Sequence, residues 1–172
     1  MRELNGTAAA VLGFLTTGEH SGYDIAKGLQ SLVGDFWNVT TSQIYRELRT
    51  LASEGLVAAG PVGARDRRPY SLTAAGHEAL NGWLDEPPGS DTVRVPLLLK
   101  LFMLFHLADP DDGALAKMAD AYRTEHADQL ARFEKQLAEL TDSRFAHLVR
   151  YGVLYERAVL SWLDSLPWRS RA

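Results

Sequence analysis

Residues Phe36 to Val57 read FWNVTTSQIYRELRTLASEGLV, a stretch that predicts a helix with an unusually polar start. Thr40 and Gln43 have the spacing of a capping box, in which each side chain accepts a hydrogen bond from the backbone N–H of the other residue. A narrow apolar stripe then recurs at helical intervals, formed by Ile44, Leu48, Leu51 and Ala52. Gly55 is typical of the left-handed residue that ends a helix. The stretch therefore predicts one short helix with a single buried side.

The other side of this predicted helix is polar and basic. Its N-terminal end would turn backbone N–H groups and hydroxyls toward an anion such as a phosphate, which the helix dipole favours. The residues concerned are Thr40, Thr41, Ser42, Gln43, Tyr45, Arg46 and Arg49. Arg49 and Gln43 are candidates to read bases, because arginine pairs with guanine and glutamine with adenine through two hydrogen bonds. The alternative is that these are ordinary solvated helix residues.

The flanking sequence predicts two earlier helices and a hairpin. An apolar run over Thr7 to Thr17 ends at the glycines of TGEHSG, and an amphipathic pattern capped by Ser21 follows from Gly22 to Val33. Leu56 to Ala59 and Pro69 to Leu72 can pair as two strands. Three helices followed by a hairpin are the element order of a winged helix-turn-helix, whose third helix enters the major groove of DNA.

The predicted hairpin has a basic tip with three arginines, Arg65, Arg67 and Arg68. Asp66 offsets only one of these charges, so contact with a DNA backbone is favoured over a merely solubilising turn. A further helix is predicted from Thr73 to Leu84. The DNA-binding domain is therefore expected to span residues 1–84.

The composition changes at DEPPGSD, Asp85 to Asp91, where prolines, a glycine and acidic residues favour an extended linker over 85–94. Residues 95–172 lack strand patterns and predict an all-α domain. Its expected helices are a buried core helix over Val95 to Ala108, a long helix over Ala114 to Leu140 and a last helix over Ala146 to Leu166. The expected fold class is mainly α with a small β-hairpin.

The two long helices of this second domain carry apolar seams at alternating spacings of three and four, the pattern of packed helix pairs. A homodimer that buries these seams is expected. The residues predicted to form its interface are Leu115, Tyr122, His126, Leu130, Phe133, Leu137, Tyr155, Val159 and Trp162.

Composition narrows the function classes. The chain has 172 residues, 46% of them hydrophobic, and a net charge of −4, so any basic surface for nucleic acid must be local. It has no cysteine, which fits a reducing cytoplasm and excludes disulfides and thiolate metal sites. The five histidines lack metal-ligand spacing, and no nucleotide-binding or nucleophile motif occurs, so neither a metal, a cofactor nor an enzymatic activity is expected. No segment has the length of a membrane span.

Three stretches resemble the DNA-binding half of the PadR family of bacterial transcriptional regulators: VLGFLTTGEHSGYDIAKGLQ, FWNVTTSQIYRELRTLASEGLV and RRPYSLTAAGHEAL. The resemblance covers Ala9 to Leu84. Its most specific parts are the Gly22–Tyr23 pair, the pattern from Ile44 to Val57, and the strand Tyr70 to Thr73 followed by Gly76. The remainder is similar to a longer subgroup of the family, with LLLKLFM and YERAVLSWL at the positions of its dimerisation helices.

The resemblance implies a dimeric regulator, usually a repressor, which binds a palindromic operator in double-stranded DNA and is released by a small molecule. Carried over by position, the DNA contacts fall on Thr41, Ser42, Tyr45 and Arg49 and on the wing arginines. Where family members often have a proline after the tyrosine, this chain has Arg46.

Aromatic residues near the predicted dimer layer are candidates to stack on a flat aromatic or hydrophobic effector. They are Trp37, Tyr122, Tyr155 and Trp162, and the alternative is that each simply packs in a core. A different function class also stays open, a winged-helix and coiled-coil module that binds another protein. The wing arginines favour DNA, because a protein-binding wing would more naturally be neutral or apolar.

Overall fold

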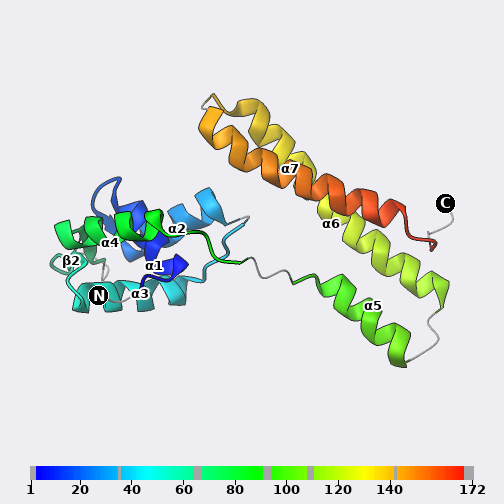
Figure 1. The fold of residues 1–172 in the computed structure, drawn as a ribbon, viewed down its shortest axis with the longest axis horizontal. Helices are drawn as coiled ribbons and strands as arrows, with labels where there is room; N and C mark the ends of the chain where they lie inside the picture. Colours follow the sequence, from blue (N-terminus) through cyan, green and yellow to red (C-terminus); the bar gives the residue numbers. More distant parts are fainter. Residues whose placement is uncertain are drawn as a thin grey trace. The chain divides into compact units, whose positions relative to one another are not determined.

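A computed structural model describes residues 3–34, 36–63, 67–90, 94–107, 111–141 and 143–168. The chain divides into two compact units, Met1–Ser90 and Asp91–Ala172, called here the N-terminal and C-terminal units. Figure 1 shows the helices and strands of each unit. Within the described ranges, every helix is too short or too polar to cross a lipid bilayer.

The N-terminal unit consists of four helices and a small antiparallel sheet. The helices are α1 (Gly6–Leu15), α2 (Gly22–Val33), α3 (Thr41–Ser53) and α4 (Ala74–Asp85), and the strands are β1 (His20–Ser21), β2 (Val57–Ala59) and β3 (Pro69–Leu72). The sheet order is β1-β3-β2, so β3 is central. The predicted helices and hairpin are confirmed. The sequence analysis missed β1, because a strand of two residues is too short to show an alternating pattern.

The apolar stripe predicted for α3 is buried in the core of this unit. Ile44, Leu48 and Leu51 are at most 1% exposed, packed with Leu12 of α1 and Ile25 of α2. Burial of this one side fixes which side of α3 faces solvent.

Both ends of α3 form as predicted. The Thr40 N–H donates to Gln43 Oε1 at 2.8 Å, and the Gln43 N–H donates to Thr40 Oγ1 at 3.3 Å. At the other end Gly55 has φ of 73°, which a residue with a Cβ rarely adopts. The start and the end of α3 are therefore determined by residues within the helix or next to it.

A buried carboxylate anchors α3 to the start of α1. Glu47 is 7% exposed, and its Oε1 accepts a hydrogen bond of 3.0 Å from the side-chain amide of Asn5. Asn5 also caps α1, where its Oδ1 accepts from the Ala8 N–H at 2.9 Å. The amphipathic pattern alone gives no signal for this contact, because it joins residues 42 positions apart.

Gly76 allows α4 to pack closely on the hairpin backbone. A Cβ at this position would lie 2.1 Å from the Leu56 carbonyl oxygen, whereas a Cβ at Gly82 of the same helix would meet nothing within 4 Å. Gly76→Ala is therefore expected to lower the free energy of unfolding by about 1–3 kcal/mol, as overpacking does. Gly82→Ala is expected to be neutral or stabilising, since alanine favours helix by up to about 1 kcal/mol. Urea denaturation of both variants checks this, and equal effects would contradict it.

The C-terminal unit contains three helices, α5 (Pro96–Leu107), α6 (Asp112–Glu139) and α7 (Ser143–Asp164). The helices α6 and α7 lie side by side (Figure 1). They run antiparallel, since Arg123 Nη1 donates to Asp164 Oδ1 at 2.6 Å and Arg157 Nη2 to Glu134 Oε1 at 2.7 Å. Their core with α5 includes Leu97, Leu101, Leu115, Ala119 and Leu163.

The prediction that α5 is a buried core helix is wrong for the single chain. Leu97 and Leu101 are buried, but the remainder of its apolar surface is not, with Leu98, Leu99, Phe102, Met103 and Phe105 each 46–60% exposed. The physical reason is that α6 and α7 cover only one side of α5, while its sequence is apolar nearly all round.

Candidate nucleic-acid interface

The solvent-facing side of α3 presents most of the residues predicted to contact DNA. Exposed side chains are those of Thr40, Thr41, Ser42, Tyr45, Arg46 and Arg49. Gln43 differs, because it is only partly exposed and its amide oxygen is used in the cap. A two-pronged contact from Gln43 to adenine would break these cap bonds, so Arg49 is the stronger candidate to read a base.

The wing arginines have different surroundings. Arg68 Nε donates to the Gly60 carbonyl at 3.0 Å, which ties β3 to the opposite side of the hairpin. The Arg67 guanidinium carbon lies 5.3 Å from the centroid of the Tyr23 ring, a cation–π contact with the start of α2. The predicted contact residue Arg65 lies outside the described residues. Arg68 thus contacts the other side of the hairpin and Arg67 contacts α2, so both described arginines interact with the rest of the N-terminal unit.

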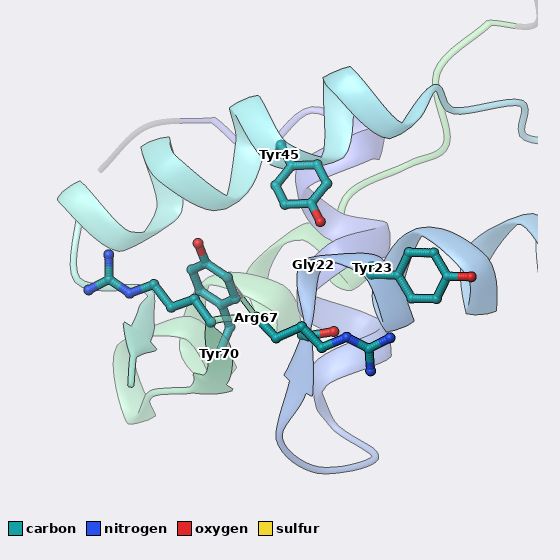
Figure 2. A pocket seen from close by; sticks show the side chains of 7 residues that line it. Gly22, Tyr23, Tyr45, Arg67 and Tyr70 are labelled. Atoms are coloured by element: carbon teal, nitrogen blue, oxygen red, sulfur yellow. The ribbon is translucent and has the colours of Figure 1, made fainter. Parts of the chain in front are cut away.

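A hollow of about 410 Å³ lies between the first turn of α2, the exposed side of α3 and the wing (Figure 2). Its lining residues are Ser21, Gly22, Tyr23, Tyr45, Arg67, Arg68 and Tyr70. Two arginines and three tyrosines are among its lining residues, and none of the described lining residues is acidic. Such a surface suits an anionic group with flat or hydrogen-bonding neighbours.

Gly22 lets Tyr45 close over the start of α2. A Cβ at Gly22 would lie 2.6 Å from Tyr45 Cε1 and 3.0 Å from its Cζ. Figure 2 shows the Tyr45 ring directed toward Gly22 and the hollow. A side chain at residue 22 would therefore displace the ring, so the glycine brings α3 and α2 into contact at this point.

The first turn of α2 is held by a capping box between Ser21 and Asp24. The Ser21 N–H and hydroxyl both donate to Asp24 Oδ2, the hydroxyl at 2.5 Å. The Ser21 hydroxyl holds the pKa of Asp24 below its ordinary value, and the charge of Arg67 lowers it further. Arg67 is thus near enough to α2 to interact with both an aromatic ring and a carboxylate.

The sequence analysis did not assign Gly22, Tyr23 or Tyr70 to the candidate interface. Tyr70 was assigned to a strand and the Gly22–Tyr23 pair to the start of a helix, and both were specific parts of the family resemblance, but none of the three was predicted to contact DNA. The sequence signal was the pair itself, because an exposed tyrosine beside a glycine in a helix's first turn needs a packing or binding reason. The structure supplies one, since both residues line the hollow.

Several of the predicted interface residues of the C-terminal unit pack within one chain. Leu115 and Phe133 are buried, and Tyr122, Val159 and Trp162 pack against the core that α5, α6 and α7 share. Leu130 and Leu137 are half-buried on α6. The helix pair that these seams predicted is thus formed at least in part by α6 and α7 of the same chain.

His126 and Glu156 form a buried hydrogen-bonded pair between α6 and α7, joined through His126 Nδ1 and Glu156 Oε2. The Tyr122 ring lies edge-on to the imidazole with centroids 4.2 Å apart, and the Tyr155 ring lies 6.5 Å away. Burial raises the pKa of the Tyr122 phenol, and nearby Tyr155 raises it further. Of the four candidate effector residues, Tyr122 and Tyr155 are thus grouped around His126.

Trp162 and Trp37 occupy other places. Trp162 is half-buried in the core of the C-terminal unit. Trp37 belongs to the N-terminal unit, is 45% exposed and lies over Gly6, where a Cβ would come within 2.3 Å of its ring. Across the described residues, no three His, Asp or Glu side chains gather closely enough to hold a metal ion.

Comparison with known proteins gives matches to both units. The sequence profile described as "Transcriptional regulator PadR-like family" matches residues 11–82, and the profile "Virulence activator alpha C-term" matches residues 93–166. Among solved structures, Bacillus subtilis PadR in complex with operator DNA has a TM-score of 0.77 and 27% identity, covering 94% of this chain and 96% of that one. Its complex with p-coumaric acid has a TM-score of 0.71 and 29% identity, with coverages of 92% and 94%.

The winged-helix arrangement and the C-terminal helical unit are thus shared with solved PadR-like structures over nearly the whole chain. Among curated proteins, the negative transcriptional regulator PadR of Bacillus subtilis is 31% identical over 169 residues, which cover 91% of this chain and 93% of that protein. The chain therefore belongs to the PadR family of transcriptional regulators.

Proposed function

We propose that this regulator is a repressor that binds a palindromic operator in double-stranded DNA as a homodimer and is released by a small aromatic or hydrophobic effector. The protein would then act in the cytoplasm, where the chromosome lies. The observation that carries the proposal is the exposed side of α3, where Tyr45, Arg46 and Arg49 follow a capped N-terminus, with Arg67 of the wing beside the start of α2.

This side of α3 has the chemistry that DNA recognition needs. The hydroxyls and backbone N–H groups at the start of α3 suit a phosphate, and Arg49 lies two turns further along, where it can reach a guanine edge. Support also comes from Bacillus subtilis PadR, a negative transcriptional regulator whose structure has been solved with operator DNA.

The homodimer is proposed from apolar surface that one chain leaves uncovered. Besides the exposed side chains of α5, α7 has an exposed stripe at helical spacing, formed by Phe145, Leu148, Tyr151, Leu154 and Tyr155. Monomeric proteins rarely expose contiguous apolar patches larger than a few hundred Å². A second copy would cover both helices and set the distance between two recognition helices.

Effector release is proposed because a similar chain has been crystallised with p-coumaric acid. Tyr122 and Tyr155 beside His126, together with Trp162 in the same unit, are the proposed contacts. Aromatic rings of this kind can stack on a flat aromatic acid. Binding there would release DNA by favouring a dimer whose recognition helices no longer match the operator spacing.

The test is enrichment of genomic fragments by the wild-type protein, followed by binding measurements on the enriched operator. Arg49→Ala is expected to weaken operator binding about 5- to 150-fold, which corresponds to the 1–3 kcal/mol of a two-pronged base contact. Its affinity for random duplex DNA should fall much less, because only one charge is lost. Arg157→Ala removes the same charge from the C-terminal unit and serves as the control.

Three outcomes separate the clauses of the proposal. Failure of the wild type to enrich any fragment in low salt would favour a protein-interaction module instead. Equal loss on operator and random DNA would show that Arg49 contacts phosphate only. Titration of the operator complex with p-coumaric acid tests the effector clause, which a complex that persists at saturating acid would contradict.

A further inference from the structure

We propose that the hollow beside α2 is the seat of one DNA backbone phosphate, and that Tyr23 is the residue that positions Arg67 for it. The inference rests on the proposed DNA-binding function and adds to it a residue and a contact outside α3. It distinguishes the part of the interface that holds the duplex from the part that reads it.

The charge in this seat comes from Arg67. Its guanidinium carbon lies 5.3 Å from the centroid of the Tyr23 ring, and both side chains are exposed, so the arginine is accessible to a ligand. An arginine on a hairpin would otherwise lose considerable side-chain entropy on binding. A guanidinium already held beside the Tyr23 ring has less entropy to lose when it binds a phosphate.

The shape of the hollow fits the same ligand. Ser21, Gly22 and Tyr23 line it at the start of α2, and Tyr45 lines it from α3. In the capping box, the Asp24 carboxylate accepts hydrogen bonds from the Ser21 N–H and hydroxyl. Two arginines and no described acidic residue line a hollow of about 410 Å³, room enough for a phosphodiester with part of its sugars.

Three elements therefore meet at one phosphate: α2, α3 and the wing. Such a contact would fix the register of α3 on the duplex without reading a base. Tyr23 acts here through Arg67, so removing the ring should matter only while Arg67 is present. That dependence separates positioning from a general role of Tyr23 in the stability of α2.

The experiment measures binding of the full-length protein to a random-sequence duplex over a series of salt concentrations. Arg67→Ala is expected to reduce the slope of log affinity against log salt by about 0.9 for each bound subunit, the value for one phosphate. Tyr23→Leu is expected to weaken binding about two- to fivefold, the range of an exposed cation–π contact. Tyr23→Phe keeps the ring and should bind like the wild type.

The double variant Tyr23→Leu with Arg67→Ala should bind no more weakly than Arg67→Ala alone. Additive losses in the double variant, or a loss in Tyr23→Phe as large as in Tyr23→Leu, would overturn the positioning role. Lys117→Ala controls for loss of a charge in the C-terminal unit. Circular dichroism confirms that each variant is folded.

Two further results would overturn the phosphate seat. An unchanged salt slope in Arg67→Ala, with wild-type binding intact, would remove the seat while leaving the DNA-binding function in place. Inorganic phosphate at constant ionic strength is expected to compete with DNA in the wild type but not in Arg67→Ala, because it would occupy the same seat. Absence of any wild-type binding to DNA would overturn the proposed function and the seat together.

Discussion

Replacing His126 by alanine is expected to destabilise the C-terminal unit by about 3–5 kcal/mol, the cost of leaving a buried carboxyl group without its partner. The side chains of His126 and Glu156 are only 12% and 7% exposed, so the pair is largely shielded from water. The remaining Glu156 carboxylate would be buried between α6 and α7 without its partner. A buried polar group that has lost its hydrogen-bond partner costs free energy.

Arg157→Ala provides the matched control for His126→Ala. Arg157 is on the same helix as Glu156 and also pairs across to α6, but its side chain is 60% exposed and that of Glu134 46%. Loss of this pair is expected to cost at most about 1 kcal/mol, because water screens it. The comparison therefore isolates burial as the cause of the difference.

Hydrogen exchange of peptides from α6 and α7 is the suitable measurement, because it reports the opening of this unit separately from the N-terminal unit. A double variant, His126→Leu with Glu156→Leu, should recover much of the lost stability, since two apolar side chains need no partner. If His126→Ala and Arg157→Ala changed protection equally, the buried pair would contribute no more than an exposed one.

The fold of the N-terminal unit could be predicted because its signals are local. The Thr40–Gln43 capping box, the Ile44–Leu51 stripe and Gly55 each encode one feature of α3, and all three formed as expected. Strand β1 could not be predicted, since its two residues pair with β3 only once α1 and α2 have brought them there. Local sequence patterns predict individual helices and strands, whereas pairing between distant segments depends on the assembled core.

The candidate nucleic-acid interface could likewise be predicted only in part. The basic side of α3 follows from helical periodicity, so Tyr45, Arg46 and Arg49 could be assigned from the sequence. The placement of Arg67 on Tyr23 could not, because it joins a wing residue to a helix more than forty positions earlier. In the C-terminal unit, a seam of threes and fours predicts that helices pack but not whether the partner is α7 or a second chain.

Replacing Phe102 or Leu154 by glutamate is expected to convert the proposed dimer into a monomer. Phe102 of α5 is 54% exposed and Leu154 of α7 is 60% exposed, each among further apolar side chains that one chain leaves uncovered. A glutamate would have to be desolvated against an apolar partner surface, at a cost of several kcal/mol in each subunit. Neither side chain belongs to the buried core of one chain, so the fold of the C-terminal unit should be retained.

Light scattering after gel filtration should give twice the 19.0 kDa of one chain for the wild type and 19.0 kDa for the variants. Ala131→Glu places the same charge at an exposed position on the polar side of α6 and should leave the mass of the dimer unchanged. Operator affinity should fall with the mass, by about 10²- to 10⁴-fold, because a monomer engages one half-site and loses the gain from linked binding. A wild type that elutes at 19.0 kDa at micromolar concentration would contradict the dimer, and with it the paired recognition helices. Variants that remain dimeric would instead place the interface on another surface. The measured mass therefore decides whether α5 and α7 form the dimer interface, and the operator affinity decides whether DNA recognition requires the dimer.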